Sequence, residues 1–157
     1  MPDREIGVRA GTAADRDFVI DTARRFAAFG PPPWRSALEV VEGEVRCLDD
    51  FFDGRLRGPV LLIAEDAGTA VGFAFLEPAI DYFSGEPHGH IGMIAVTAAA
   101  EGRGAGAALM RAADAWARAC CYSKLTLNVF EGNRRARQVY ERFGYQVETV
   151  RYVKTIE

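Results

Sequence analysis

The residues best suited to chemistry lie in a glycine-rich stretch near the middle of the chain. An apolar run ends at Ile94, Ala95 and Val96, and a helical pattern follows the stretch Gly102-Arg103-Gly104-Ala105-Gly106-Ala107. The first N–H groups of a helix lack backbone acceptors, and the helix dipole adds about half a positive charge beside them. Glycines carry no Cβ, so a diphosphate could approach this backbone closely, and Arg103 could add a cation. The stretch therefore predicts a phosphate-binding turn.

Two well-known phosphate-binding loops do not fit this stretch. A P-loop ends in Gly-Lys-Ser or Gly-Lys-Thr, which is absent. A dinucleotide fingerprint needs the loop after the first strand of its unit and an acidic residue about 20 positions later, whereas Asn128 lies on the next expected strand. Glycine spacing alone also fits an ordinary turn before a helix, so a second signal is needed.

The second signal is the pattern N-x2-A-x3-Y-x3-G-Y between Asn133 and Tyr145. Asn133 is a typical helix N-cap residue, and Gly144 is a typical helix stop. Between them, Tyr140 shares an apolar face with Ala136 and Phe143. A phenol with a pKa near 10 can give a proton to a leaving thiolate. The alternative is that Tyr140 is only a core residue.

Together, the two motifs strongly resemble the GNAT superfamily of N-acetyltransferases. The resemblance covers about Ile91 to Tyr145 and implies transfer of an acetyl group from acetyl-CoA to a primary amine. It implies that the turn binds the pyrophosphate, that the strand ahead of it pairs with the pantetheine, and that Tyr140 is the general acid. The family usually has Gln or Arg where this chain has Glu101. The cofactor-binding residues implied are Ile94, Ala95, Val96, Gly102, Arg103, Gly104, Ala105, Gly106, Ala107, Asn128, Asn133 and Tyr140.

The general base is left open by the sequence. Many GNAT members carry an acid on the fourth strand, where this chain has Gly92. The candidates are Glu77, His90 and Glu86, or no dedicated base at all. His88 and His90 are only two residues apart and have no third ligand nearby, so no metal is expected.

Alternative functions and acceptors also remain open. Without the strand acid, a non-catalytic acyl-CoA-binding sensor or interaction module of the same fold is the alternative to an enzyme. The loop from Asp81 to Glu86, together with Glu77, could form an acidic mouth for a cationic acceptor. An acyl-cysteine route through Cys120 or Cys121 is a further alternative, although packing roles are expected for both.

The elements that must position these residues follow from periodicity. Val60 to Ala64, Ala70 to Leu76 and His90 to Val96 are expected strands, with a loop from Asp81 to Gly89. Other strands are expected over residues 5–9, 125–129 and 145–156, and helices over 13–28, 36–52, 104–119 and 133–143. The order predicts an α/β fold with a mixed sheet and helices on both faces. The resemblance implies a mostly antiparallel sheet whose parallel fourth and fifth strands splay apart.

Length and composition bear on the number of domains, the binding partners and the cellular location. The chain has 157 residues, which predicts a single domain over 1–157. Its net charge of -3 does not indicate binding to nucleic acid or to an anionic membrane. Three cysteines without C-x-x-C spacing predict reduced thiols and a cytoplasmic protein. Many GNAT members dimerise, so a homodimer is compatible with the resemblance.

Overall fold

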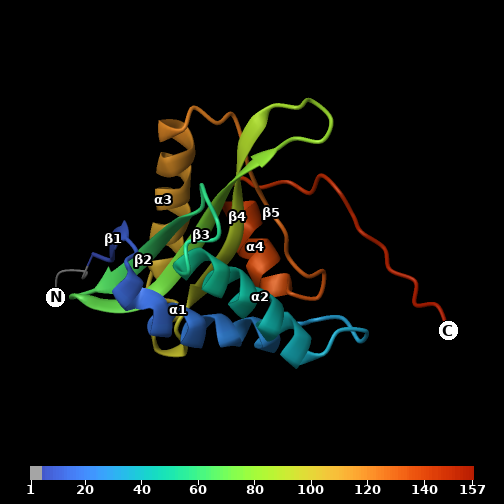
Figure 1. The fold of residues 1–157 in the computed structure, drawn as a ribbon, viewed down its shortest axis with the longest axis horizontal. Coiled ribbons are helices and arrows are strands. Elements are labelled where there is room, and N and C mark those ends of the chain that lie inside the picture. Colours follow the sequence, from blue (N-terminus) through green and yellow to red (C-terminus); the bar gives the residue numbers. More distant parts are fainter. Residues whose placement is uncertain (1–4) are drawn as a thin grey trace.

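A five-stranded sheet forms the centre of the protein in a computed structural model that describes residues 5–157 (Figure 1). The strands lie in the order β1-β2-β3-β4-β5, and every pair is antiparallel except β4–β5, which is parallel. This topology confirms the predicted mixed sheet. The strands are β1 (Gly7–Ala10), β2 (Val60–Asp66), β3 (Thr69–Ile80), β4 (Pro87–Val96) and β5 (Leu125–Leu127).

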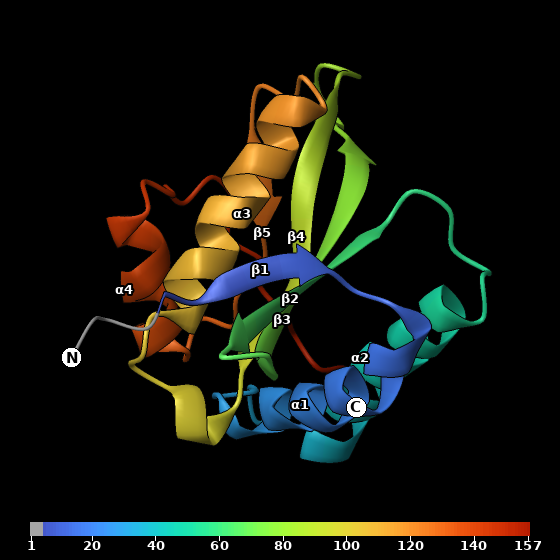
Figure 2. The same cartoon turned by 90° about the vertical axis from the view of Figure 1, so that its left-hand side faces the viewer.

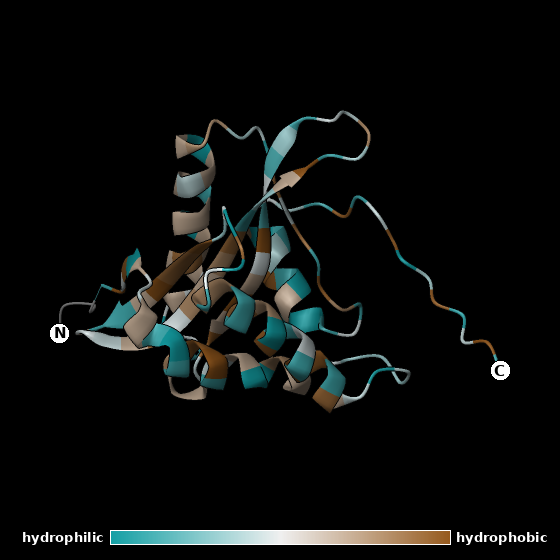
Figure 3. Cartoon of the chain, viewed as in Figure 1, coloured by the Kyte–Doolittle hydropathy of each residue, from teal (hydrophilic) through white to brown (hydrophobic). Residues whose placement is uncertain are grey.

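Helices cover both faces of this sheet (Figure 2). One face packs Phe73 and Phe75 against the helices α1 (Arg16–Ala23) and α2 (Ala37–Phe52). The other face packs against α3 (Ala105–Ala119), with α4 (Arg134–Arg142) contributing Tyr140 at its edge. Because β3 is buried on both faces, Val71 to Leu76 is an unbroken apolar run apart from one glycine. Figure 3 shows hydrophobic residues along the central strands and both hydrophilic and hydrophobic residues along the helices.

Local signals fix where the helices begin. The Ser36 hydroxyl accepts a hydrogen bond from the Glu39 N–H at 3.0 Å, which starts α2. The Asn133 side chain accepts one from the Ala136 N–H at 3.2 Å and starts α4. The Asn133 cap confirms the sequence prediction. The expected helix over 13–28 is divided, because α1 has a short 3₁₀ helix at each end.

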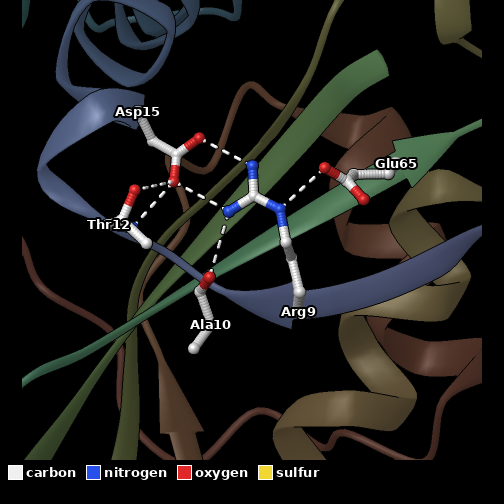
Figure 4. A network of polar contacts seen from close by, with 5 residues as sticks. All are labelled: Arg9, Ala10, Thr12, Asp15 and Glu65. Carbon is white, nitrogen blue, oxygen red and sulfur yellow. Dashed lines mark hydrogen bonds and ion pairs between the residues drawn. The ribbon is translucent and has the colours of Figure 1, made fainter. Parts of the chain in front are cut away.

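A charged network joins the first strand to the first helix (Figure 4). The Arg9 guanidinium donates to both carboxylate oxygens of Asp15 at 2.8 Å and to Glu65 at 2.7 Å. Asp15 also accepts from the Thr12 N–H at 2.7 Å. These hydrogen bonds hold β1 beside β2 and orient the chain as it enters α1.

Several expected strand boundaries are wrong. β3 continues to Ile80, beyond its expected end at Leu76. β4 begins at Pro87, inside the expected loop 81–89, because its first residues pair with the extended end of β3. β5 ends at Leu127 instead of residue 129. The segment 145–156, expected to complete the sheet, forms no strand and runs away from the body (Figure 1). A strand-like sequence pattern favours β-pairing, but a strand forms only where the segment also lies beside the edge of another strand.

Candidate active site

The parallel strands β4 and β5 separate soon after they meet. Residues 89–91 pair with residues 125–127, whereas β4 continues to Val96. Gly92 is an extra residue at a bulge, because Phe75 pairs with Met93 and Leu76 pairs with Ile91. Within the described chain, residues 92–96 therefore have no strand partner on the β5 side. The family-implied splay is present in this structure.

We call residues 92–96 of β4 the free edge. The direction of its peptide groups shows which backbone donors and acceptors are available there. The Thr97 N–H donates to the Val71 carbonyl of β3 at 2.8 Å. Successive N–H groups of a strand point to opposite sides, so the Val96 N–H points to the free edge. An extended chain lying along this edge would find backbone donors and acceptors at its side.

The free edge leads into the glycine turn before α3. Gly102 and Gly104 have positive φ values of 72° and 90°, and a Cβ built on either would meet no atom within 4 Å. The Ala108 N–H donates to the Gly104 carbonyl at 3.0 Å, whereas no acceptor within residues 5–157 is found for the amides of Ala105, Gly106 and Ala107. The turn therefore presents the open amides that an anion-binding helix start requires.

Arginines other than the expected one surround this turn. Arg103 pairs with Asp66 at 2.8 Å, on the side of the β2–β3 turn. Arg25 donates to the Val96 carbonyl and to Glu101, the latter at 2.6 Å. Arg135 reaches the other oxygen of Glu101 at 3.4 Å. The hydrogen bond from Arg25 is the main cause that lowers the pKa of Glu101, so this carboxylate is paired rather than left facing the turn.

Tyr140 lies on α4 against the cluster under α3. Its ring meets the Tyr145 ring edge-on, with centroids 6.1 Å apart. Burial raises the pKa of Tyr140, so its phenol keeps its proton at neutral pH. Of the two asparagines in the predicted set, Asn133 is engaged as the cap of α4, and Asn128 is exposed just beyond β5.

A carboxylate fills the space above Gly92. Glu77 of β3 pairs with His90 of β4, so the two side chains leave the same face of the sheet. A Cβ built on Gly92 would lie only 2.6 Å from the Glu77 Oε2 atom. Burial raises the pKa of Glu77. The pKa of Glu44 on α2 is raised by burial and then by the Glu77 charge, so a second carboxylate faces the same region.

His90 belongs to a three-residue hydrogen-bonded group. Its Nδ1 atom lies 2.8 Å from the Thr126 hydroxyl of β5, and the His88 Nε2 atom lies 3.1 Å from the same oxygen. A hydroxyl has one proton, so one imidazole accepts from it and the other donates to it. Burial, followed by the His88 charge, lowers the pKa of His90. No set of three or more metal-ligating side chains occurs among residues 5–157.

The loop carboxylates expected at an acidic mouth are used differently. Asp81 pairs with Lys124 and accepts from the N–H groups of Phe83 and Ser84 at 2.9 and 2.8 Å, so it holds the β3–β4 loop together. Glu86 is exposed on this loop. Glu44, which gave no sequence signal, is the carboxylate that lies near Glu77.

The cysteines lie in environments unsuited to a nucleophile beside the turn. Burial is the main cause that raises the pKa of Cys47 to about 11, which keeps its thiol protonated. Cys120 and Cys121 follow the last residue of α3, at the end opposite the turn. A helix of this length separates its two ends by roughly 20 Å.

A family model described as "Acetyltransferase (GNAT) family" matches residues 26–145, which contain the free edge, the glycine turn and Tyr140. The chain belongs to the GNAT family of acetyltransferases. The members of this family are acyltransferases, and acetyl-CoA is the co-substrate that the family uses. In the described part of this GNAT chain, no helix combines the length and apolar character needed to cross a membrane.

Relatives agree with the GNAT assignment. Mycothiol acetyltransferase of Propionibacterium freudenreichii is 30% identical over 90% of this chain, and the chain spans only 44% of that protein. An uncharacterized N-acetyltransferase of Bacillus subtilis, YhfO, is 36% identical over 63% of this chain and 68% of its own length. The fold matches a solved aminoglycoside N-acetyltransferase in complex with CoA at a TM-score of 0.70 and 18% identity, over 98% of this chain and 95% of that one.

Proposed function

We propose that this GNAT protein transfers the acetyl group of acetyl-CoA directly to a primary amine. The observation that carries the proposal is the free edge of β4, residues 92–96, which leads into the open amides at the start of α3. The amides of a pantetheine chain would pair with this edge as an added strand does, and the diphosphate would lie on the helix start. Arg25 and Arg135, beside Glu101, would supply cations to the phosphates.

The transfer itself needs one base and one acid. The amine nitrogen forms a bond to the thioester carbonyl carbon, and the carbon–sulfur bond breaks with its electron pair going to sulfur. Glu77 accepts the proton that leaves the nitrogen, and the Tyr140 hydroxyl gives its proton to the sulfur. The Val96 N–H, on the free edge, donates to the carbonyl oxygen as negative charge develops there.

Glu77 is our choice of base over His90. Its carboxylate fills the space above Gly92, at the beginning of the free edge. Its raised pKa also makes it a stronger base than an ordinary glutamate. His90 lies in the paired part of β4, its Nδ1 atom is held by Thr126, and its pKa is lowered, so it lines the site as a neutral imidazole.

We infer a cationic acceptor from the same carboxylates. An amine is an ammonium ion before it reacts, and the negative charges of Glu77 and Glu44 would attract this ion to the site. The carboxylates of the β3–β4 loop contribute less, because Asp81 is already paired with Lys124.

Two tyrosines give a matched test of the acid. In a thiol-release assay with acetyl-CoA and a panel of amines, Tyr140→Phe should lower kcat about 10²–10⁴-fold, with KM for acetyl-CoA nearly unchanged. Tyr145→Phe is the control, because it removes a neighbouring buried hydroxyl for which the described structure shows no hydrogen-bond partner. Full turnover in the Tyr140 variant would contradict the acid role. Acetyl-CoA binding without turnover on any amine would favour a sensor over an enzyme.

A further inference from the structure

The only two histidines of the chain share one hydroxyl group. His88 and His90 lie two residues apart on β4, so both side chains leave the same face of the sheet. The Thr126 hydroxyl oxygen on β5 lies 2.8 Å from the His90 Nδ1 atom and 3.1 Å from the His88 Nε2 atom. No other hydrogen-bond partner of this oxygen occurs within residues 5–157. The hydroxyl proton therefore goes to one ring, and the other ring donates to the oxygen.

A buried nitrogen of His88 distinguishes the two possible arrangements. If Thr126 donates to His90, both rings carry their proton on Nε2, and if it donates to His88, both carry it on Nδ1. The His88 Nδ1 atom is buried and has no hydrogen-bond partner within residues 5–157, so a proton there would be a buried, unpaired N–H. Buried N–H groups without a partner are rarer than buried acceptors without one. The surroundings of His88 therefore favour Nε2–H on both rings.

The second nitrogen of His90 is available to a ligand. The side chain is half-buried, and its Nε2 atom has no hydrogen-bond partner within residues 5–157. Glu77, the proposed base, is directly opposite His90 in the β3–β4 register, and the Cβ atoms of such a pair lie about 5 Å apart. An amine whose nitrogen lies at Glu77 therefore brings atoms a few bonds away to His90. Burial is the main cause that lowers the pKa of His90, so this donor is an uncharged ring.

We propose that the His90 Nε2–H donates a hydrogen bond to an oxygen of the acceptor, and that Thr126 positions this ring. The preferred acceptor is a primary amine with a neutral oxygen within a few bonds of its nitrogen, as in amino alcohols, amino ethers and amino amides. A carboxylate oxygen would be repelled by Glu77 and Glu44. An alkylamine would leave the N–H without a partner, which weakens binding. This inference rests on the proposed transfer to an amine and specifies the class of amine.

Two amines of matched shape test this preference. Methoxyethylamine and butylamine have chains of the same length, and the ether oxygen of the first can only accept a hydrogen bond. The ratio of their kcat/KM values is measured by thiol release from acetyl-CoA. Comparing this ratio between the wild type and a variant cancels the difference in basicity of the two amines. His90→Phe should lower the ratio about 3- to 10-fold, which corresponds to the loss of one hydrogen bond. A ratio equal to that of the wild type would overturn the proposal.

Two substitutions of Thr126 test its positioning role. Thr126→Val removes the hydroxyl that fixes the proton of His90, so the ratio should fall about 3-fold or more. Thr126→Ser keeps the hydroxyl and is the matched control, which should retain the wild-type ratio. Retention of the ratio in the valine variant would show that Thr126 does not position the ring.

Nuclear magnetic resonance tests the same proposal without any turnover. In nitrogen-15-labelled protein at about pH 8, above the ordinary histidine pKa of about 6.5, long-range proton–nitrogen correlations report which ring nitrogen carries the proton. Both histidines should be Nε2–H tautomers, and two Nδ1–H rings would overturn the proposal whether or not the protein turns over. Turnover with an unchanged ratio in His90→Phe would overturn this inference alone, whereas no turnover on any amine would overturn the proposed function with it.

Discussion

At the scale of single residues, the pair Glu77 and Gly92 explains how a base can be present without an acid on β4. The glycine leaves a space, and the carboxylate from the neighbouring strand lies 2.6 Å from where its Cβ would be. The two positions are separated by a turn in sequence and joined only by the β3–β4 register, including its bulge. Comparing the sequence with the family motif position by position therefore finds no base at Gly92. The structure shows that Glu77, from the neighbouring strand, lies in that place.

The pH dependence of catalysis tests this assignment. Burial raises the pKa of Glu77 above its ordinary 4.5, so the basic form should be lost at a higher pH than for an exposed glutamate. Glu77→Gln should lower kcat/KM about 10²–10⁴-fold at neutral pH. The ratio of wild-type to variant kcat/KM cancels the titration of the acceptor amine. It should rise with pH through the pKa of Glu77 and then level off.

Glu86→Gln is the control for that measurement, because Glu86 is exposed on the hairpin loop. It should change kcat/KM by less than a factor of about two. A wild-type to Glu77→Gln ratio that stays constant with pH would show that another group removes the proton.

Some site residues could not be predicted from the sequence. Tyr140 and the glycine turn lie in motifs whose spacing is local, so the sequence alone points to them. Arg25 and Thr126 gave no signal, because their partners Val96 and His90 are 71 and 36 residues away. Arg103 is the cation that the sequence places at the turn, yet it pairs with Asp66, 37 residues away. Contacts of this kind depend on the folded sheet.

At the scale of elements, helices were predicted better than strands. Ser36 and Asn133 act within one turn of their own helices, so a few neighbouring residues define where α2 and α4 begin. Strand length depends on the partner. β4 starts early because β3 continues to Ile80, and β5 ends early because β4 diverges from it after Ile91. The segment 145–156 has the pattern of a strand but pairs with no strand within residues 5–157, which periodicity alone does not show.

At the scale of the whole molecule, the Arg9 network links the N-terminal strand to the helical layer. Asp15 is only 7% exposed, and hydrogen bonds from Arg9, followed by one from Thr12, lower its pKa from 3.8 to about 2. A carboxyl group with a lowered folded-state pKa stabilises the fold above its unfolded pKa. This stabilisation, about 2 kcal/mol, is lost as the pH falls through about 2.

Urea unfolding of Asp15→Asn tests this stabilisation. At pH 7 the variant should lose about 2 kcal/mol of unfolding free energy, and its difference from the wild type should shrink as the pH falls below 3.8. Asp21→Asn is the control, since its side chain is 80% exposed beside Arg24, and it should change stability by no more than about 0.5 kcal/mol. A difference that is independent of pH would contradict the ionic origin of the stabilisation.

The most direct test of the site as a whole is calorimetric titration of coenzyme A into two glycine variants. Gly104 and Gly54 both have positive φ values, 90° and 74°, with no atom within 4 Å of where a Cβ would lie, and only Gly104 precedes α3. Valine should strain both backbones alike, by about 1–2 kcal/mol. We predict that the wild type and Gly54→Val bind coenzyme A and that Gly104→Val binds at least about 10-fold more weakly. Equal affinity in both variants, or no binding by the folded wild type, would contradict a diphosphate site at the start of α3.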